Sequence, residues 1–152
     1  MSNGWKYKDT FITSLEDVPV KNAVGFIYII TQKSTGKMYL GKKLLTKAAT
    51  KTIKGVKKKL RKESDWLSYW SSSPKIQQWI EESGTDDFER EILVFASSKG
   101  SMVYLEEFGL YEVGALESDK WINDNIRSKV YRTWCKPDEA KELRDVLRKY
   151  EP

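Results

Sequence analysis

Residues 24–41 read V-G-F-I-Y-I-I-T-Q-K-S-T-G-K-M-Y-L-G, and this stretch predicts a β-hairpin. The apolar run over residues 24–30 is short and rich in β-branched and aromatic side chains, which favours a buried strand over a helix. Residues 34–36 supply a turn, because Gly36 can take a positive φ at little cost. Residues 37–40 then alternate polar and apolar side chains, as a half-buried return strand does.

Tyr28 and Tyr39 are the chemically active side chains of this hairpin. Phenols on adjacent strands can reach one small substrate group together. Tyrosine is also enriched in strands for its packing alone. On the residues alone, a purely structural role for both tyrosines therefore stays open.

The sequence contains no histidine and a single cysteine, Cys135. Zinc sites of His and Cys and catalytic triads of Ser-His or Cys-His are therefore excluded. Any proton transfer must use Tyr, Lys, Glu, Asp or water. Cys135 has no partner for an internal disulfide, and no run of about 18 apolar residues is present to span a membrane. We therefore expect a cytoplasmic protein with no membrane partner.

Basic residues are concentrated in the segment 42–62, which holds ten Lys or Arg and no acid. The whole chain carries +5, yet without this segment the remaining 17 basic and 22 acidic residues leave a formal charge of −5. Such a block is commonly a solvated or mobile segment. It also has the composition of a phosphate-binding surface, whose affinity falls steeply with salt. This second interpretation assigns nucleic-acid binding to ten residues: Lys42, Lys43, Lys47, Lys51, Lys54, Lys57, Lys58, Lys59, Arg61 and Lys62.

The rest of the pattern predicts helices and one further strand. In chain order we expect a flexible loop over 46–55, a helix over 56–69, a helix from Pro74 to Gly84, a strand over 88–95, a helix beginning near Ser101, an extended piece over 121–126 and a terminal helix from Pro137.

These elements predict an α+β domain with a small, mainly antiparallel three-stranded sheet flanked by helices, plus a C-terminal helix. At 152 residues the chain is long enough for one core. We expect an N-terminal arm over residues 1–23 that covers one edge of the sheet. The domain itself is expected over 24–126, with the basic insertion at 42–62, and a C-terminal extension with its helix over 127–152.

The hairpin resembles the signature of the GIY-YIG nuclease family. Phe26-Ile27-Tyr28 corresponds to the first triplet and Tyr39-Leu40-Gly41 to the second. Phe26 replaces the first glycine of the literal motif, and Gly25 lies one place earlier. The resemblance covers residues 24–126 and implies the family's fold, in which the third strand follows two helices.

The resemblance implies a DNA endonuclease that hydrolyses phosphodiester bonds with one Mg²⁺ or Mn²⁺ ion. The family holds this ion with a single glutamate on the helix after the third strand, three and four positions before two bulky apolar residues. That register favours Glu107, which precedes Leu110 and Tyr111. The neighbouring Glu106 would place Gly109 at the first of these positions, which fits less well.

The remaining catalytic roles also follow from the resemblance. Tyr28 is expected to act as general base, which requires nearby cations because the pKa of free tyrosine is near 10. Tyr39 is expected to orient water or phosphate, and Arg61 to hold the phosphate, with Lys42 or Lys43 sharing or replacing that role. Tyr69 is expected in place of the family's His or Tyr, and Gly41 belongs to the second triplet. Asn123 is the expected late asparagine, with Asn125 as its alternative, and residues 70–73 resemble a small polar stretch that some family members carry.

Double-stranded DNA is the expected partner, and the sequence leaves open whether the protein forms a homodimer. A small free-standing nuclease of the phage or mobile-element type, including homing endonucleases, fits this pattern. Two alternatives remain: a catalytically inactive family member that only binds nucleic acid, and an unrelated basic nucleic-acid-binding domain.

Overall fold

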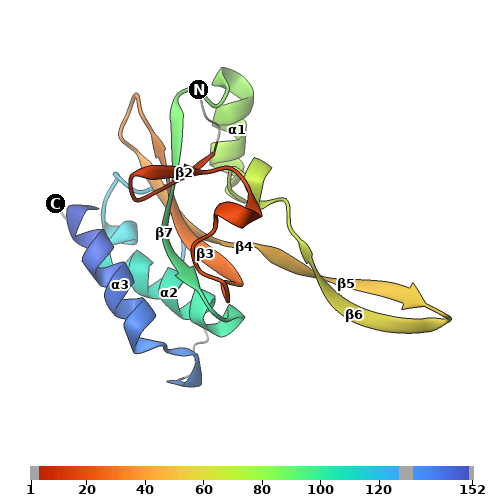
Figure 1. The fold of residues 1–152 in the computed structure, drawn as a ribbon. Coiled ribbons are helices and arrows are strands. Elements are labelled where there is room, and N and C mark those ends of the chain that lie inside the picture. The colour runs from red at the N-terminus through yellow and green to blue at the C-terminus, as the bar shows by residue number, and fades with distance from the viewer. Residues whose placement is uncertain (1–3, 127–131, 151–152) are drawn as a thin grey trace.

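The structure is a computed structural model that describes residues 4–126 and 132–150. Figure 1 shows a body of strands and helices from which one long hairpin projects. The strands are β1 (Trp5–Tyr7), β2 (Thr10–Ile12), β3 (Gly25–Gln32), β4 (Met38–Leu44), β5 (Thr46–Ile53), β6 (Val56–Glu63) and β7 (Phe88–Ala96). The helices are α1 (Pro74–Ser83), α2 (Lys99–Glu112) and α3 (Pro137–Leu147), with short 3-10 turns at Leu15–Asp17, Trp66–Ser68, Ala115–Glu117, Arg132–Trp134 and Arg148–Tyr150.

The main sheet has five strands in the order β2-β1-β7-β3-β4. Its pairs are antiparallel except for β1 with β7, which run parallel. The α+β class and the mainly antiparallel pairing are confirmed, and the sheet is larger than the three strands expected. The first residues of the chain make the difference, because β1 and β2 extend the sheet beyond β7 and thus cover its edge as expected.

The predicted hairpin is confirmed as β3 and β4, with Tyr28 opposite Gly41 and Ile30 opposite Tyr39. Gly36 takes a φ of +75° in the turn, the conformation for which glycine is suited. On its other side β3 pairs with β7, and the register shifts between Ile27 and Tyr28. A β-bulge therefore lies beside Tyr28, and bulges of this kind re-aim the neighbouring side chains.

The two faces of the sheet carry separate cores. Helices α2 and α3 pack side by side against one face, where Ile27, Ile29 and Leu40 are buried. The other face buries Phe26 and Tyr28 against residues of β1, the 66–70 segment and α1. Successive strand residues point to opposite faces, so the hairpin tyrosines lie on the face away from α2 and α3.

The helices after the hairpin begin where the sequence indicates. Ser73 caps α1 by accepting a hydrogen bond from the Ile76 amide at 3.5 Å, Pro74 opens it, and Gly84 ends it with a φ of +78°. Pro137 opens α3. None of the helices in the described parts of the chain is long and apolar enough to cross a membrane. Parts of two expected segments lie outside the described residues. They are residues 127–131 and 151–152 of the extension and residues 1–3 of the arm.

The basic segment does not form the expected loop and helix. It forms a second hairpin, in which β5 pairs with β6 from Thr46 opposite Glu63 to Ile53 opposite Val56. The two-residue turn at Lys54 and Gly55 has φ values of +51° and +76°. Two positive φ values are the mark of a type I′ turn, whose twist matches that of the flanking strands. This hairpin extends away from the body in both views.

Candidate active site

The two tyrosines of the first hairpin lie close together on one face. Their ring centroids are 6.3 Å apart. Gly41 lies between them, and a Cβ atom there would come within 2.5 Å of the Tyr28 hydroxyl oxygen and 2.9 Å of a Tyr39 ring carbon. The missing side chain of Gly41 therefore makes the room in which the two phenols meet.

Tyr28 is almost fully enclosed, with 1% of its surface exposed. Its ring contacts Trp5 at a centroid distance of 5.3 Å and Tyr69 at 6.0 Å. Burial raises the pKa of Tyr28 well above its ordinary value, and the neighbouring phenols of Tyr69 and Tyr39 raise it further. The Tyr28 hydroxyl is therefore neutral at physiological pH in the free protein. Burial also raises the pKa of Tyr39, against a hydrogen bond with Ser72 that lowers it.

Two lysines directly after the second tyrosine bring positive charge to the site. The Lys42 ammonium pairs with the Glu106 carboxylate at 2.9 Å. The Lys43 ammonium lies 4.1 Å from the centre of the Tyr69 ring and pairs with Asp65 at 2.5 Å. Both lysines were expected to share or replace the role of the arginine, and both line the same hollow as the tyrosines.

These groups surround a hollow of about 270 Å³. Its walls include both tyrosines, both lysines and one carboxylate. The complete lining is Tyr28, Tyr39, Lys42, Lys43, Leu44, Ser72, Met102 and Glu106. A second, smaller hollow shares Tyr39 and Ser72 and continues toward Asn123 and the start of α1.

Glu106, and not Glu107, supplies the carboxylate of this hollow. Successive helix residues point about 100° apart, so adjacent glutamates cannot face the same way. Leu105 and Gly109 direct α2 onto the sheet, since Leu105 is fully buried and the nearest atom to a Cβ at Gly109 would be a Leu40 methyl at 3.1 Å. This orientation turns Glu106 toward Lys42.

Glu107 lies outside the walls of the hollow, contrary to the expectation from its register. It is only 4% exposed, and within the described part of the chain neither of its carboxylate oxygens has a hydrogen-bond partner. Burial raises the pKa of Glu107, the charge of Glu106 raises it further, and Lys42 acts in the opposite direction.

The side chain of Asn123 hydrogen-bonds to the main chain of the edge strand β4. Its side-chain oxygen accepts a hydrogen bond from the Leu40 amide at 3.1 Å, and its amide nitrogen donates to the Leu40 carbonyl at 2.9 Å. Leu40 lies between Tyr39 and Gly41, so this clamp fixes the stretch of β4 that carries the second tyrosine. Asn125 lines the smaller hollow without such a contact.

Arg61 is placed away from the tyrosines, contrary to the expected position on a first helix. It lies on β6, exposed, and donates hydrogen bonds to the Thr46 carbonyl at 2.6 Å and the Thr46 hydroxyl at 3.0 Å. The expected helix is a strand here, because residues 46–63 close on the turn at Lys54 and Gly55. The other basic residues from Lys47 to Lys62 lie on the same projecting hairpin.

Arg90 is a buried residue of β7 that was not among the expected site residues. It is 2% exposed, lies 4.1 Å from the Trp70 ring and 4.6 Å from the Trp5 ring, and donates to the carbonyls of Leu67 and Tyr69 at 3.1 and 2.7 Å. Burial lowers the pKa of Arg90 to about 10, which leaves it charged at neutral pH. It anchors the segment that brings Tyr69 against Tyr28. Its place in the strand pattern of residues 88–95 gave no sign of this role.

Ser71, part of the small polar stretch named from the sequence, adopts a φ of +97° although it is not glycine. Its hydroxyl accepts from the Ser73 amide at 2.9 Å, and its carbonyl accepts from Gln77 at 3.0 Å. Strained conformations of this kind persist where the surroundings fix them, commonly beside functional sites.

The walls of the hollow offer a single carboxylate, that of Glu106, as a ligand for a divalent cation. Among the residues that the structure describes, no group of three or more acidic, His or Cys side chains comes together. One carboxylate, completed by waters and phosphate oxygens, is a common way for proteins to hold Mg²⁺. A hollow of about 270 Å³ has room for such waters beside Glu106.

On this α+β domain the first hairpin contributes two tyrosines and two lysines to the hollow, and α2 contributes one carboxylate. The chain belongs to the GIY-YIG endonuclease family: residues 5–126 match the family model described as "Putative endonuclease segE, GIY-YIG domain". No curated protein and no solved structure matches the chain. Membership of this family supports nuclease activity in general, and a nuclease domain acts on nucleic acid.

Proposed function

We propose that this protein is a metal-dependent DNA endonuclease that hydrolyses phosphodiester bonds in the hollow between Tyr28, Tyr39 and Glu106. The observation that carries the proposal is the convergence of two phenols, two ammonium groups and one carboxylate from separate elements on that hollow. A structural pair of strand tyrosines would need neither the lysines nor the glutamate beside it.

Glu106 is proposed to hold one Mg²⁺ or Mn²⁺ ion, which when bound stabilises negative charge on the phosphate and the leaving oxygen. Lys42 holds the Glu106 carboxylate in place at 2.9 Å and adds positive charge to the phosphate site. Lys43, which lies over the Tyr69 ring and pairs with Asp65, adds a second positive charge to the same site. Together these lysines take the part that the family resemblance gives to an arginine.

Tyr28 is proposed to accept the proton of the attacking water, directly or through a second water. Its pKa is raised by burial in the free protein, so this role depends on the positive charge that Lys42, Lys43 and the metal bring to the loaded site. Tyr39 orients the water or the phosphate, and Asn123 positions Tyr39 through the main chain of Leu40.

A plasmid-nicking assay with Mg²⁺ and with EDTA tests the proposal. The wild-type protein should convert supercoiled plasmid to nicked or linear forms only with the metal, and Tyr28→Phe should slow this by about 100-fold or more. Tyr7→Phe is the matched control, because Tyr7 is another buried tyrosine that packs on Phe95 and lies outside the hollow.

If the wild-type protein binds the plasmid and leaves it intact under these conditions, the protein is an inactive, nucleic-acid-binding member of the family. A Tyr28→Phe protein that cuts as fast as Tyr7→Phe would refute the role of this phenol.

A further inference from the structure

The β5–β6 hairpin is an exposed ribbon whose two faces differ in charge. Residues directly opposite each other in an antiparallel pair share a face. One face carries Lys47 opposite Lys62 and Lys51 opposite Lys58, and we refer to these four residues as the lysine-pair face. On the other face each cation lies opposite a small neutral residue: Arg61 opposite Ala48, Lys59 opposite Thr50 and Lys57 opposite Thr52.

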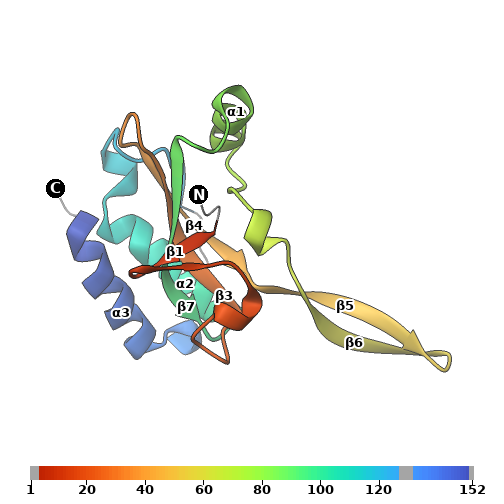
Figure 2. The same ribbon diagram turned by 45° about the horizontal axis from the view of Figure 1, so that its top comes forward.

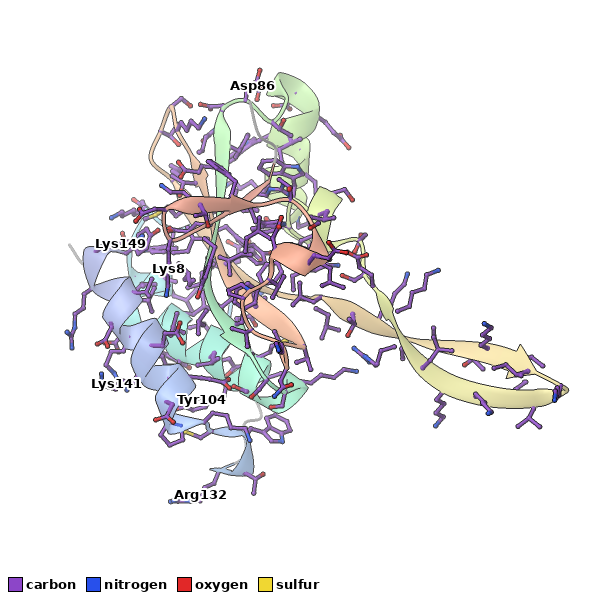
Figure 3. The ribbon with its side chains drawn as sticks, in the orientation of Figure 1. Lys8, Asp86, Tyr104, Arg132, Lys141 and Lys149 are labelled. Atoms are coloured by element: carbon purple, nitrogen blue, oxygen red, sulfur yellow. The ribbon has the colours of Figure 1, made fainter. Side chains whose placement is uncertain are left out.

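The lysine-pair face is unfavourable for the free protein. Like charges directly opposite each other destabilise a strand pair, and a two-stranded hairpin without further cover is only marginally stable. Among the described residues, none of the four lysines takes part in an ion pair. Figure 3 shows the side chains of this ribbon standing out from it with no other element beside them. The arrangement becomes favourable when an anionic partner lies against the face.

The spacing of the lysine pairs indicates what that partner is. Lys47 and Lys51 are four residues apart on β5, which is about 13 Å along a strand. The major groove of B-form DNA is about 12 Å wide and admits a two-stranded β-ribbon. Between the two lysine pairs lie Ala49 and Leu60, which present small and apolar side chains to the groove.

The ribbon is also joined directly to the candidate active site. It begins at Thr46, just after β4, which ends at Leu44 and carries Tyr39 and both pocket lysines. Its root is held to the body by the Leu45 amide, which donates to Val24, and by the Ser64 amide, which donates to Leu45. Lys51 lies eight residues beyond Lys43, at most about 27 Å away along the chain. Both pairs therefore come within about one turn of duplex from a phosphate in the hollow.

We propose that the lysine-pair face docks on the major groove of double-stranded B-form DNA, each lysine pair reaching the phosphates of one groove wall. This inference rests on the proposed DNA endonuclease function and adds to it the element that holds the duplex outside the catalytic hollow. The deep, narrow major groove of A-form RNA cannot admit the ribbon, so the geometry selects DNA over an RNA duplex.

Charge-matched variants of the two faces test this inference. Lys51→Gln/Lys58→Gln removes one pair from the lysine-pair face, and Lys57→Gln/Lys59→Gln removes the same charge from the other face of the same ribbon. Binding to a mixed-sequence DNA duplex is measured by fluorescence anisotropy in EDTA, between about 50 and 200 mM salt. An RNA duplex of the same sequence is measured alongside.

Each lost phosphate contact lowers the salt slope of the binding constant by about 0.9. The Lys51/Lys58 variant should therefore lose about 2 from the slope and bind DNA roughly 30-fold more weakly at about 0.15 M salt. The Lys57/Lys59 variant should lose less than half of that slope. Equal losses in the two variants, or the same difference between them on the RNA duplex, would overturn the proposal.

The outcomes also separate this inference from the proposed function. A wild-type protein that fails to cut DNA refutes the nuclease and leaves the binding comparison unaffected, because binding is measured without metal. A protein that cuts DNA while both variants bind alike refutes the docking face alone. Loss of fold does not confuse the comparison. Replacing both lysines of the Lys51/Lys58 pair relieves repulsion, and Lys57 and Lys59 are exposed, so both variants should keep a melting temperature at or above that of the wild type.

Discussion

Gly41→Ala is expected to separate the phenols of Tyr28 and Tyr39, which are proposed to act together, without removing either of them. The added Cβ would lie 2.5 Å from the Tyr28 hydroxyl oxygen, 2.6 Å from its ring carbon and 2.9 Å from a Tyr39 ring carbon. Ordinary contacts of a Cβ begin at 3.4 Å, so Tyr28 must give way by about 0.9 Å. Trp5 and Tyr69 pack against the Tyr28 ring, so the ring can be displaced only toward the hollow.

The magnitude follows from that displacement. A misplacement of about 1 Å at a reacting group costs about 100-fold in rate, which corresponds to about 2.7 kcal/mol in the activation free energy. The same overpacking should lower the free energy of unfolding by about 1–3 kcal/mol. The assay is the single-turnover rate of plasmid nicking at saturating protein, below the melting temperature of the variant.

Gly36→Ala is the matched control for this prediction. Gly36 has a positive φ of +75° and nothing within 4 Å of a Cβ. Alanine there should cost about 1–2 kcal/mol of stability through its backbone and leave the nicking rate unchanged. A folded Gly41→Ala protein that cuts within about threefold of the Gly36→Ala rate would refute the reasoning.

Three further changes have defined outcomes. Asn123→Ala removes both hydrogen bonds to Leu40 and should lower the free energy of unfolding, measured in urea, by about 2 kcal/mol. It should also lower kcat by more than it raises KM. An unchanged kcat would contradict the positioning role of Asn123. Arg90→Met leaves the carbonyls of Leu67 and Tyr69 without their donor and should cost about 3 kcal/mol in the same measurement. Because the pKa of Tyr28 is raised in the folded state, the contribution of this phenol to stability should be constant below pH 10 and fall by up to about 1.4 kcal/mol per pH unit above it. Tyr28→Phe should therefore lose stability less steeply than the wild type above pH 10, and an identical profile there would contradict the buried phenol.

Much of the body of the protein is predictable from local signals. The first hairpin is specified by its apolar run and by Gly36, and α1 by the cap at Ser73 followed by Pro74. The third expected strand, residues 88–95, is β7 almost to the residue. In each case the side chains that define the element also define its ends, so little depends on distant contacts.

The second hairpin was missed because two patterns overlap in residues 56–69. Val56, Leu60 and Leu67 have a spacing that also suits a helix, and ten cations with no acid obscure the alternation of the strands. The decisive signal was the dipeptide Lys54-Gly55 after the β-branched Ile53, which forms the turn of a hairpin. The expected position of Arg61 on a helix was wrong for the same reason, because Arg61 lies on β6 of this hairpin.

The choice between adjacent glutamates depends on tertiary contacts that a linear motif does not contain. The orientation of α2 is set by Leu105 and Gly109 against Leu40 of the sheet. That contact turns Glu106 to the hollow and leaves Glu107 buried outside it. Arg90 illustrates the same limit, because only the folded chain brings it between two tryptophans.

The plasmid-nicking rates of Glu106→Gln and Glu107→Gln in Mg²⁺, compared in one experiment, test most directly where the catalytic site lies. The two changes are chemically identical and one residue apart on α2, but Glu106 lines the hollow whereas Glu107 is buried outside it. Glu106→Gln should slow nicking by about 100-fold or more, while Glu107→Gln should cut at close to the wild-type rate. Loss of activity in Glu107→Gln with Glu106→Gln near wild type would contradict the site built around Tyr28, Tyr39 and Glu106.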